Sequence, residues 1–218
     1  IKYLYKKARK VIVVSEQMKV DLVENYNVPK EKIEVIYNSY PIKRITTLAQ
    51  NKLGKREQEI FNNPTIITAG RLYKQKGQHH LINAFKRVKE FIPHSQLVFL
   101  GEGRLENSLR EKARALDIYD SVHFLGFQEN PFKYIALSKA FVMTSYYEGF
   151  PNALAEAMIC KIPVISTDCP SGPREILAPD ELNQNIRYTF EDQERRYGFL
   201  VPAIGDENET QVENLIAH

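Results

Sequence analysis

The chain has 218 residues, 43% of them hydrophobic and 26% charged, so it can bury a sizeable core in one or two domains and is not a disordered chain. A formal net charge of +3 gives no reason to expect a nucleic-acid partner. The two cysteines, Cys160 and Cys169, lack the spacing of a zinc site and are too few for a disulfide framework, which is typical of a reducing compartment.

The start of the chain, IKYLYKKARK, places basic side chains around Tyr3, Leu4 and Tyr5. Such a face can lie on anionic lipid, and it equally suits a solvated helix whose apolar side packs on a domain core. The sequence shows neither an apolar run near the roughly 18 to 20 residues of a membrane span nor a signal-peptide pattern. We therefore expect a cytoplasmic chain, with peripheral contact to the inner face of the membrane as one use of this segment. Because the chain opens on Ile1 and stops within a helical pattern, we expect a piece of a longer protein.

Two apolar runs and a polar stretch follow. VIVVS (11–15) predicts a buried strand, Ser15 is placed to cap a helix through MKVDLVENY, and KIEVIYNS predicts a second strand. Residues 46–64 are polar, have a helical pattern and close on Asn-Asn-Pro, which predicts a linker or surface helix. We expect residues 1–45 to be the last part of an earlier domain.

Residues 65–218 alternate short apolar runs with helical patterns and are expected to form one further domain. The predicted strands are TIITAG, QLVFLGEG, SVHFLGF, AFVMTS, PVIST and GFLVP. Because strands separated by helices call for parallel crossovers, the predicted fold class is α/β, a doubly wound parallel sheet of the Rossmann-like type. In such a sheet the ligand lies beyond the carboxyl ends of the strands. Gly, Arg, Lys and Glu are frequent in the loops at those ends.

The loop AGRLYKQKG offers cations to an anion. Arg71 and Lys76 follow a predicted strand and flank a helix start at Gly77, so two positive charges and free helix N–H groups can converge on a diphosphate. The plainer alternative is a solvated Arg and Lys on a turn. The loop lacks the second and third glycines of G-x-G-x-x-G, which argues against an oxidoreductase.

The stretch YEGFPNALAEAM places two carboxylates beside a helix start. Gly149 permits a tight turn, and Pro151 and Asn152 favour a helix that begins near residues 151–152. Glu148 is then at the mouth of the site, while Glu156 lies one turn inside among small side chains. A carboxylate there needs partners, and vicinal sugar hydroxyls are suitable ones, with an ion pair to a nearby Lys or Arg as the alternative.

The pattern E-G-F-P-N-x-L-x-E-A-M, together with GRL and KG at residues 70–77, resembles the C-terminal half of a retaining glycosyltransferase of the GT-B fold, family 4. KVIVVSEQMKVDL resembles the segment that crosses from the acceptor domain into the donor domain, and PSGPREIL and YGFLVP match later parts of the family pattern. The resemblance covers nearly the whole chain. It implies that residues 65–218 are the nucleotide-sugar donor-binding domain of a GT-B enzyme.

The resemblance also implies a role for each matching position. Arg71 and Lys76 would hold the donor diphosphate, and Glu156 would bind the ribose hydroxyls. Glu148 would face the transferred sugar, which makes Arg71, Lys76 and Glu148 the candidate catalytic residues. The full expected donor-binding set is Gly70, Arg71, Lys76, Gly126, Phe127, Glu148, Gly149, Phe150, Pro151, Asn152 and Glu156.

The predicted function is transfer of a sugar from a nucleotide-sugar, with a UDP-hexose or UDP-N-acetylhexosamine expected, to a glycan or lipid-linked acceptor with retention. We expect a hexosyltransferase that is incomplete in this chain and needs no metal or cofactor, since no D-x-D pair is present. The alternatives are a sugar-nucleotide epimerase or phosphorylase on the same fold, or a noncatalytic nucleotide-binding module.

Two further features complete the sequence reading. Residues 178–198 are longer and more charged than the family's usual loop, which predicts a surface insertion or a contact to another domain or chain. His79 and His80 are expected to open a helix and to have ordinary structural roles, because the histidines suggest no catalytic triad.

Overall fold

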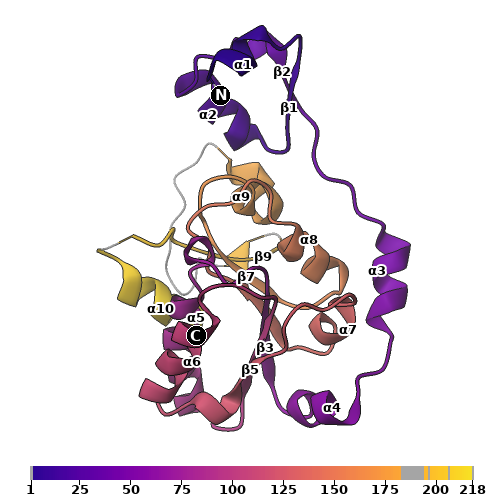
Figure 1. The fold of residues 1–218 in the computed structure, drawn as a ribbon, viewed down its shortest axis with the longest axis vertical. Helices are drawn as coiled ribbons and strands as arrows, with labels where there is room; N and C mark the ends of the chain where they lie inside the picture. The colour runs from indigo at the N-terminus through magenta and orange to yellow at the C-terminus, as the bar shows by residue number, and fades with distance from the viewer. Residues whose placement is uncertain (1, 183–193, 196, 206, 218) are drawn as a thin grey trace.

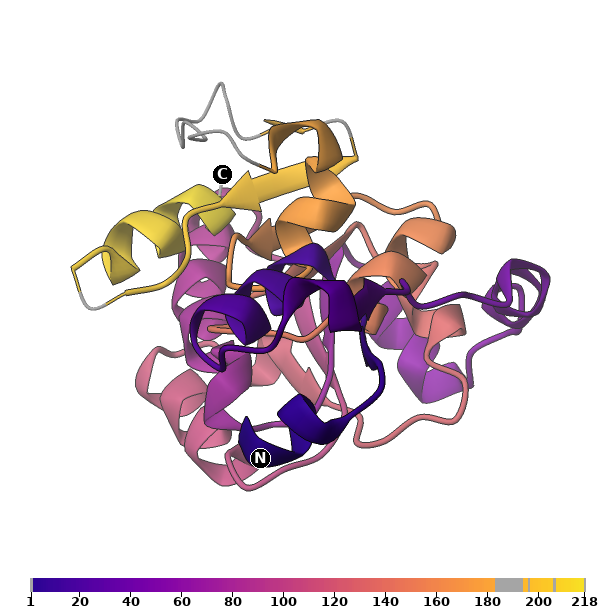
Figure 2. The same ribbon diagram turned by 90° about the horizontal axis from the view of Figure 1, so that it is seen from above.

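A computed structural model describes residues 2–182, 194–195, 197–205 and 207–217, and the statements below concern these residues. Figure 1 shows a small N-terminal group of elements at one end, a larger layered group at the other, and a connection that runs down one side between them. The same arrangement seen from above in Figure 2 places the N-terminal group over one end of the layered group.

The layered group is built on a seven-stranded sheet whose order is β5, β4, β3, β6, β7, β9, β8. Every neighbouring pair is parallel except β8 and β9. The doubly wound parallel sheet predicted from the sequence is therefore confirmed, and the strand order reverses at β3. The strands are β3 (Thr65–Ala69), β4 (Gln96–Leu100), β5 (Val122–Phe124), β6 (Ala140–Met143), β7 (Val164–Thr167), β8 (Glu194–Arg195) and β9 (Gly198–Val201).

Helices cover both faces of this sheet, which explains why its strands are unbroken apolar runs. Residues 97–100 of β4, for example, are all buried. One face carries α5 (Gln78–Phe91), α6 (Glu106–Ala115) and α10 (Glu209–Ala217). The other carries α7 (Phe132–Ile135), α8 (Asn152–Ile159) and α9 (Pro173–Leu177).

The N-terminal group has a small core of its own. A parallel pair of strands, β1 (Val11–Val13) and β2 (Ile33–Val35), packs with α2 (Glu16–Glu24) around buried residues such as Leu22 and Val28, and α1 (Lys2–Lys7) precedes them. Ser15 caps α2 as predicted, because its side chain accepts a hydrogen bond from the Met18 amide at 3.1 Å. The strand predicted over KIEVIYNS is shorter than expected, since pairing ends at Val35.

The polar connection forms two helices, α3 (Ile42–Ala49) and α4 (Lys55–Phe61), where one surface helix or linker was predicted. Ile45 of α3 is buried, and α3 contacts α7 and α8. The division of the chain at residues 45 and 64 stays a prediction. The single-turn 3-10 helices are Lys30–Lys32, Lys74–Lys76, Tyr119–Ser121 and Pro179–Glu181.

Glu175 of α9 ties the N-terminal group to the layered group. Its carboxylate accepts hydrogen bonds from the Glu16 amide at 2.8 Å, the Gln17 amide at 3.1 Å and the Tyr37 hydroxyl at 2.9 Å. A carboxylate at the start of α2 satisfies free helix N–H groups and complements the helix dipole. Burial and then Glu175 raise the pKa of Tyr37 to about 12, so this hydroxyl stays protonated and donates.

The Glu175→Ala variant is expected to lose about 1 to 3 kcal/mol of unfolding free energy, because three donors lose a charged acceptor. We also expect faster proteolysis of the chain between β2 and α3. Urea unfolding and timed protease digestion would measure both effects. Glu24→Ala is the matched control, since Glu24 is an exposed glutamate at the other end of the α2 helix that Glu175 contacts. Equal behaviour of the two variants would contradict the assigned role of Glu175.

The charged stretch 178–198 lies largely outside the described residues, so its predicted role as an insertion or contact stays a prediction. Its described parts include Pro179–Glu181 and β8, which adds an antiparallel edge to the sheet. In the part of the chain that the structure describes, no helix is both long and apolar enough to cross a bilayer.

Candidate functional site

A cavity of about 330 Å³ opens where β3 and β6 end, at the strand switch point. This is where an open parallel sheet is expected to bind its ligand. Residues from the loop after β3, the start of α5, the loop after β6 and the start of α8 line it. The predicted site residues among its lining are Gly70, Arg71, Lys76, Glu148, Phe150, Pro151 and Asn152.

Lys76 and Glu148 form an ion pair across this cavity. Lys76 Nζ lies 2.6 Å from Glu148 Oε1, and the side chain of Glu148 is only 8% exposed. Ser145 Oγ donates to the same carboxylate oxygen at 2.6 Å. The ammonium group has three donors, so one can hold Glu148 while others face an anion. The sequence predicted both residues at the mouth but not their pairing.

Arg71 is the exposed cation of the site. Its guanidinium lies 5.5 Å from the centre of the Tyr73 ring, and it forms no ion pair with any described residue. A guanidinium with free donors suits the bidentate binding of phosphate oxygens. The structure therefore brings Arg71 and Lys76 to one cavity, as the sequence predicted.

The start of α5 is fixed by a close backbone approach. Gly77 has φ +58°, and a Cβ there would lie 2.1 Å from the Thr144 carbonyl oxygen, so only glycine fits. Gln78 is buried beside it and donates to the Arg71 carbonyl at 3.0 Å, while its Oε1 has no partner among the described residues. The sequence reading missed Gln78, although its place at a helix start beside Lys76 was a usable signal.

The start of α8 is held by contacts to the chain that follows β2. As predicted, α8 begins at Asn152, but the Asn152 side chain does not cap the helix. Asn152 Oδ1 instead accepts hydrogen bonds from Asn38 Nδ2 at 2.7 Å and the Tyr40 hydroxyl at 2.9 Å. The rings of Phe150 and Tyr37 pack with centroids 5.6 Å apart. Residues far apart in sequence therefore hold Phe150 and Asn152, which line this side of the cavity.

A second, more apolar cavity of about 770 Å³ shares Ala69, Gly70 and Arg71 with the first. Phe127 lines it and is 72% exposed, so its ring is available to stack on a planar ligand. Gly126 lies just before it with φ +69°, and its carbonyl accepts from the Gly101 amide at 2.7 Å. The two cavities together offer an apolar end and a charged end.

Like Gly126, the two remaining predicted residues, Glu156 and Gly149, line neither of these cavities. Glu156 lies on α8, and partial burial raises the pKa of its carboxyl. Its carboxylate forms no hydrogen bond or ion pair with a described residue, so the predicted alternative of an ion pair is not seen within that part of the chain. A Cβ added to Gly149 would have Met18 Sδ of α2 at 3.8 Å as its nearest neighbour. The proposed roles of both residues stay predictions.

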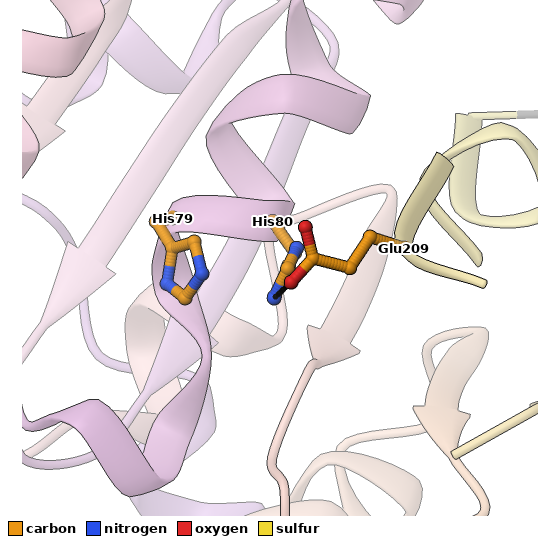
Figure 3. Close-up of side chains that lie close together, drawn as sticks. All are labelled: His79, His80 and Glu209. Atoms are coloured by element: carbon orange, nitrogen blue, oxygen red, sulfur yellow. Dashed lines mark ion pairs between the residues drawn. The ribbon is translucent and has the colours of Figure 1, made fainter. Parts of the chain in front are cut away.

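His79 and His80 open α5 as predicted, and they lie beside Glu209 of α10 (Figure 3). Burial, followed by the neighbouring His80 and Lys112, lowers the pKa of His79 from 6.5 to about 4. His79 is therefore neutral in the folded protein at neutral pH.

This lowered pKa predicts a pH dependence of stability. As the pH falls, His79 binds a proton in the unfolded chain before it does so in the folded protein. The free energy of unfolding should therefore have its full value above pH 6.5 and fall as the pH drops towards 4. After allowance for the half-exposed ring, the loss attributable to His79 is about 1 to 2 kcal/mol. Urea unfolding between these pH values should show a shallower fall for His79→Gln but not for His94→Gln, a change at an exposed histidine. Identical slopes for all three proteins would contradict this account.

Comparison with known proteins identifies the family. Residues 50–195 match the family described as Glycosyl transferases group 1, and residues 1–44 match Glycosyltransferase Family 4. The chain belongs to the group 1 glycosyltransferases. It is 40% identical over 201 residues to an uncharacterised glycosyltransferase of Methanocaldococcus jannaschii, an overlap that spans 91% of this chain and 49% of that protein.

Other glycosyltransferases show the same partial overlap. The N-acetylgalactosamine-N,N'-diacetylbacillosaminyl-diphospho-undecaprenol 4-alpha-N-acetylgalactosaminyltransferase of Campylobacter jejuni is 35% identical over 181 residues, 83% of this chain and 47% of that protein. The structure of Staphylococcus aureus TarM solved with UDP, Fondaparinux and alpha-GlcNAc-glycerol matches with a TM-score of 0.71 at 22% identity, covering 99% of this chain and 40% of that one. Anabaena HepE in complex with UDP matches with a TM-score of 0.70 at 21% identity, covering 99% and 59%. These likenesses confirm the predicted GT-B type of fold. This glycosyltransferase chain spans about half the length of the curated relatives named here.

Proposed function

We propose that this chain is the donor-binding half of an enzyme that transfers a hexose or N-acetylhexosamine from a UDP-sugar to a glycan or lipid-linked acceptor with retention of anomeric configuration. The observation that carries the proposal is the convergence of Arg71, Lys76 and the start of α5 on one cavity that also holds Glu148. Family membership supports glycosyl transfer, and UDP in the TarM and HepE structures supports the choice of nucleotide.

The two cavities suit the two ends of such a donor. The apolar cavity with Phe127 would take the base, while the charged cavity would take the diphosphate and the sugar. Arg71 lines both, so it lies where the base end meets the phosphate end. Glu156 would hold the ribose hydroxyls, since it is a half-buried carboxylate without a partner among the described residues.

The chemistry follows from the charges. When the bond between the anomeric carbon and the diphosphate oxygen breaks, the electron pair stays on the diphosphate, whose negative charge increases. Arg71, Lys76 and the N–H groups of α5 are already in place to stabilise that charge, so they favour the transition state over the ground state. The acceptor hydroxyl forms the new bond to the anomeric carbon and gives its proton to an oxygen of the departing diphosphate. Glu148, held by Lys76 and Ser145, would face the sugar during this exchange.

The partners and location follow as parts of the same proposal. The acceptor would be a glycan or a lipid-linked sugar, which agrees with the diphospho-undecaprenol in the printed name of the Campylobacter jejuni relative. A lipid-linked acceptor would favour peripheral contact with the inner face of the membrane, for which the basic N-terminal segment is the candidate. We propose no role for a metal or cofactor. The epimerase, phosphorylase and noncatalytic alternatives gain no support from the named relatives, which are glycosyltransferases.

Saturation-transfer NMR of the chain with UDP-glucose and UDP-N-acetylglucosamine would test the proposal. We expect the strongest transfer to the uracil and ribose protons and a weaker signal on the sugar ring, because Phe127 offers an apolar surface for the base. The Phe127→Ser variant should lose most of the uracil signal, whereas Phe91→Ser, a change at an exposed phenylalanine of α5, should not. No transfer to any proton of either compound would contradict the proposed function.

A further inference from the structure

A buried polar bridge joins the C-terminal helix to the loop that carries Glu148. His80 of α5 is 1% exposed, and its Nδ1 lies 3.0 Å from Glu213 Oε1 of α10. On the other side of the ring, Nε2 lies 2.9 Å from the hydroxyl of Tyr146, which belongs to the loop after β6. Figure 3 shows the His80 ring facing the start of α10. We call Glu213, His80 and Tyr146 the His80 bridge.

The protons of the His80 bridge can be assigned from its donors and acceptors. Glu213 Oε1 also accepts from Asn83 Nδ2 at 2.6 Å, so this oxygen acts as an acceptor in the bridge. His80 Nδ1 must then carry a proton and donate to Glu213. In the neutral ring this leaves Nε2 as an acceptor for the Tyr146 hydroxyl. Each link of the bridge is therefore a directional hydrogen bond.

Tyr146 also connects the His80 bridge to the residues around the 330 Å³ cavity, which we call the donor cavity. Its amide donates to the Gln75 carbonyl at 2.8 Å, and Gln75 Nε2 donates back to the Tyr147 carbonyl at 2.8 Å. Thr144 Oγ1 donates to the Lys76 carbonyl at 3.0 Å. The loop after β6 and the turn before α5 are thus bonded to each other over the stretch that supplies Glu148 and Lys76.

A metal site is the competing explanation of this region, because ligand atoms of His79, His80 and Glu209 lie within 4.8 Å of one another. Both nitrogens of His80 are already engaged, however, and Glu209 Oε1 lies farther from Nε2, at 3.7 Å, than the Tyr146 hydroxyl does. A cation would have to displace the Tyr146 bond. Lys112 acts on His79 with positive charge, which opposes cation binding, and the opposite charge of Glu213 has a smaller effect on His79. The hydrogen-bonded bridge accounts for the geometry better.

We propose that the His80 bridge positions the loop after β6, so that the packing of α10 on α5 holds Glu148 of this loop at the geometry the reaction requires. His80 and Tyr146 are then positioning residues, and neither touches the substrate. The role of the bridge in the reaction rests on the proposed function. The connection of α10 to the loop after β6 rests only on the hydrogen bonds of the His80 bridge. It assigns the last helix of the chain a part in donor binding.

Hydrogen exchange of the intact chain tests the coupling without any nucleotide. Tyr146→Phe removes only the bridging hydroxyl and should speed exchange of the Tyr146 and Glu148 amides about fivefold, with little change in global stability. Tyr147→Phe is the matched control, because Tyr147 is the neighbouring, 58% exposed tyrosine. Equal exchange of the loop in Tyr146→Phe and wild type would overturn the proposal.

A second variant acts at the far end of the bridge. Glu213→Leu keeps a side chain of similar size in α10 but removes the acceptor of the His80 Nδ1 hydrogen bond. The amides of residues 146 and 148 should therefore exchange faster. This result would show that the effect travels from α10 to the loop. Faster exchange confined to α5 and α10 would overturn it. If Glu213→Leu fails to fold, Tyr146→Phe still decides the question.

Calorimetric titration with UDP then measures the functional consequence. We expect Tyr146→Phe to bind UDP about threefold to tenfold more weakly than wild type and Tyr147→Phe to bind it equally. Unchanged binding despite faster loop exchange would overturn the positioning role. If the wild type itself binds no UDP, the proposed function fails, and the exchange experiment still decides whether α10 holds the loop.

Discussion

The Lys76→Met variant is expected to lose affinity for a nucleoside diphosphate by about tenfold to a hundredfold, which corresponds to the loss of one charge-assisted hydrogen bond to phosphate. Its free energy of unfolding should also fall by about 2 to 4 kcal/mol, because the nearly buried Glu148 would keep Ser145 as its one side-chain partner among the described residues. Calorimetric titration and urea unfolding would measure the two effects separately. The direction of the stability change follows from the 2.6 Å ion pair between Lys76 and Glu148.

A double variant separates the two roles of Lys76. In Lys76→Met combined with Glu148→Gln, the buried charge is gone, so most of the lost stability should return while nucleotide affinity stays low. Lys74→Met is the matched control, because Lys74 is an exposed lysine of the same turn. If the double variant recovers binding, or if Lys74→Met loses as much affinity as Lys76→Met, the assigned roles are wrong.

The Gly77→Ala variant is expected to destabilise the protein by about 2 to 4 kcal/mol and to distort the donor cavity. An alanine Cβ would lie 2.1 Å from the Thr144 carbonyl oxygen in a left-handed backbone conformation, so the turn before α5 and the loop after β6 must separate. Thermal unfolding measures the destabilisation, and UDP titration measures the distortion. Both should change in the same variant.

Gly205→Ala is the control for this change. Among the described residues, a Cβ at Gly205 would meet Asn208 Oδ1 alone, at 3.8 Å, and the φ of Gly205 lies outside the left-handed region. We expect a change within about 0.5 kcal/mol. Gly77→Ala with stability and affinity like those of Gly205→Ala would show that the close approach of the two loops does not matter.

The fold could be predicted from the sequence because its signals are local. Unbroken apolar runs such as TIITAG and QLVFL predict strands covered on both faces, and the helical patterns between them require parallel crossovers. Placing Arg71, Lys76 and Glu148 near one another needed only the rule that strand ends share an edge. These parts of the prediction agree with the structure.

The contacts within the site depend on strand order, which the sequence does not give. Lys76 meets Glu148, which lies 72 residues later in the sequence, because β6 pairs with β3. Asn152 was predicted as a helix starter, and its side chain instead holds Asn38 and Tyr40 of the preceding connection. His80 was given an ordinary structural role, because its partner Glu213 lies 133 residues away on α10.

Calorimetric titration of the chain with UDP, GDP and ADP, repeated on Arg71→Met, tests the central claim most directly. We predict that UDP binds and that Arg71→Met weakens this binding about tenfold or more while the unfolding free energy stays unchanged, since Arg71 is exposed and makes no ion pair with a described residue. A folded chain that binds none of the three nucleotides, or that binds UDP equally well without Arg71, would contradict the donor-site account.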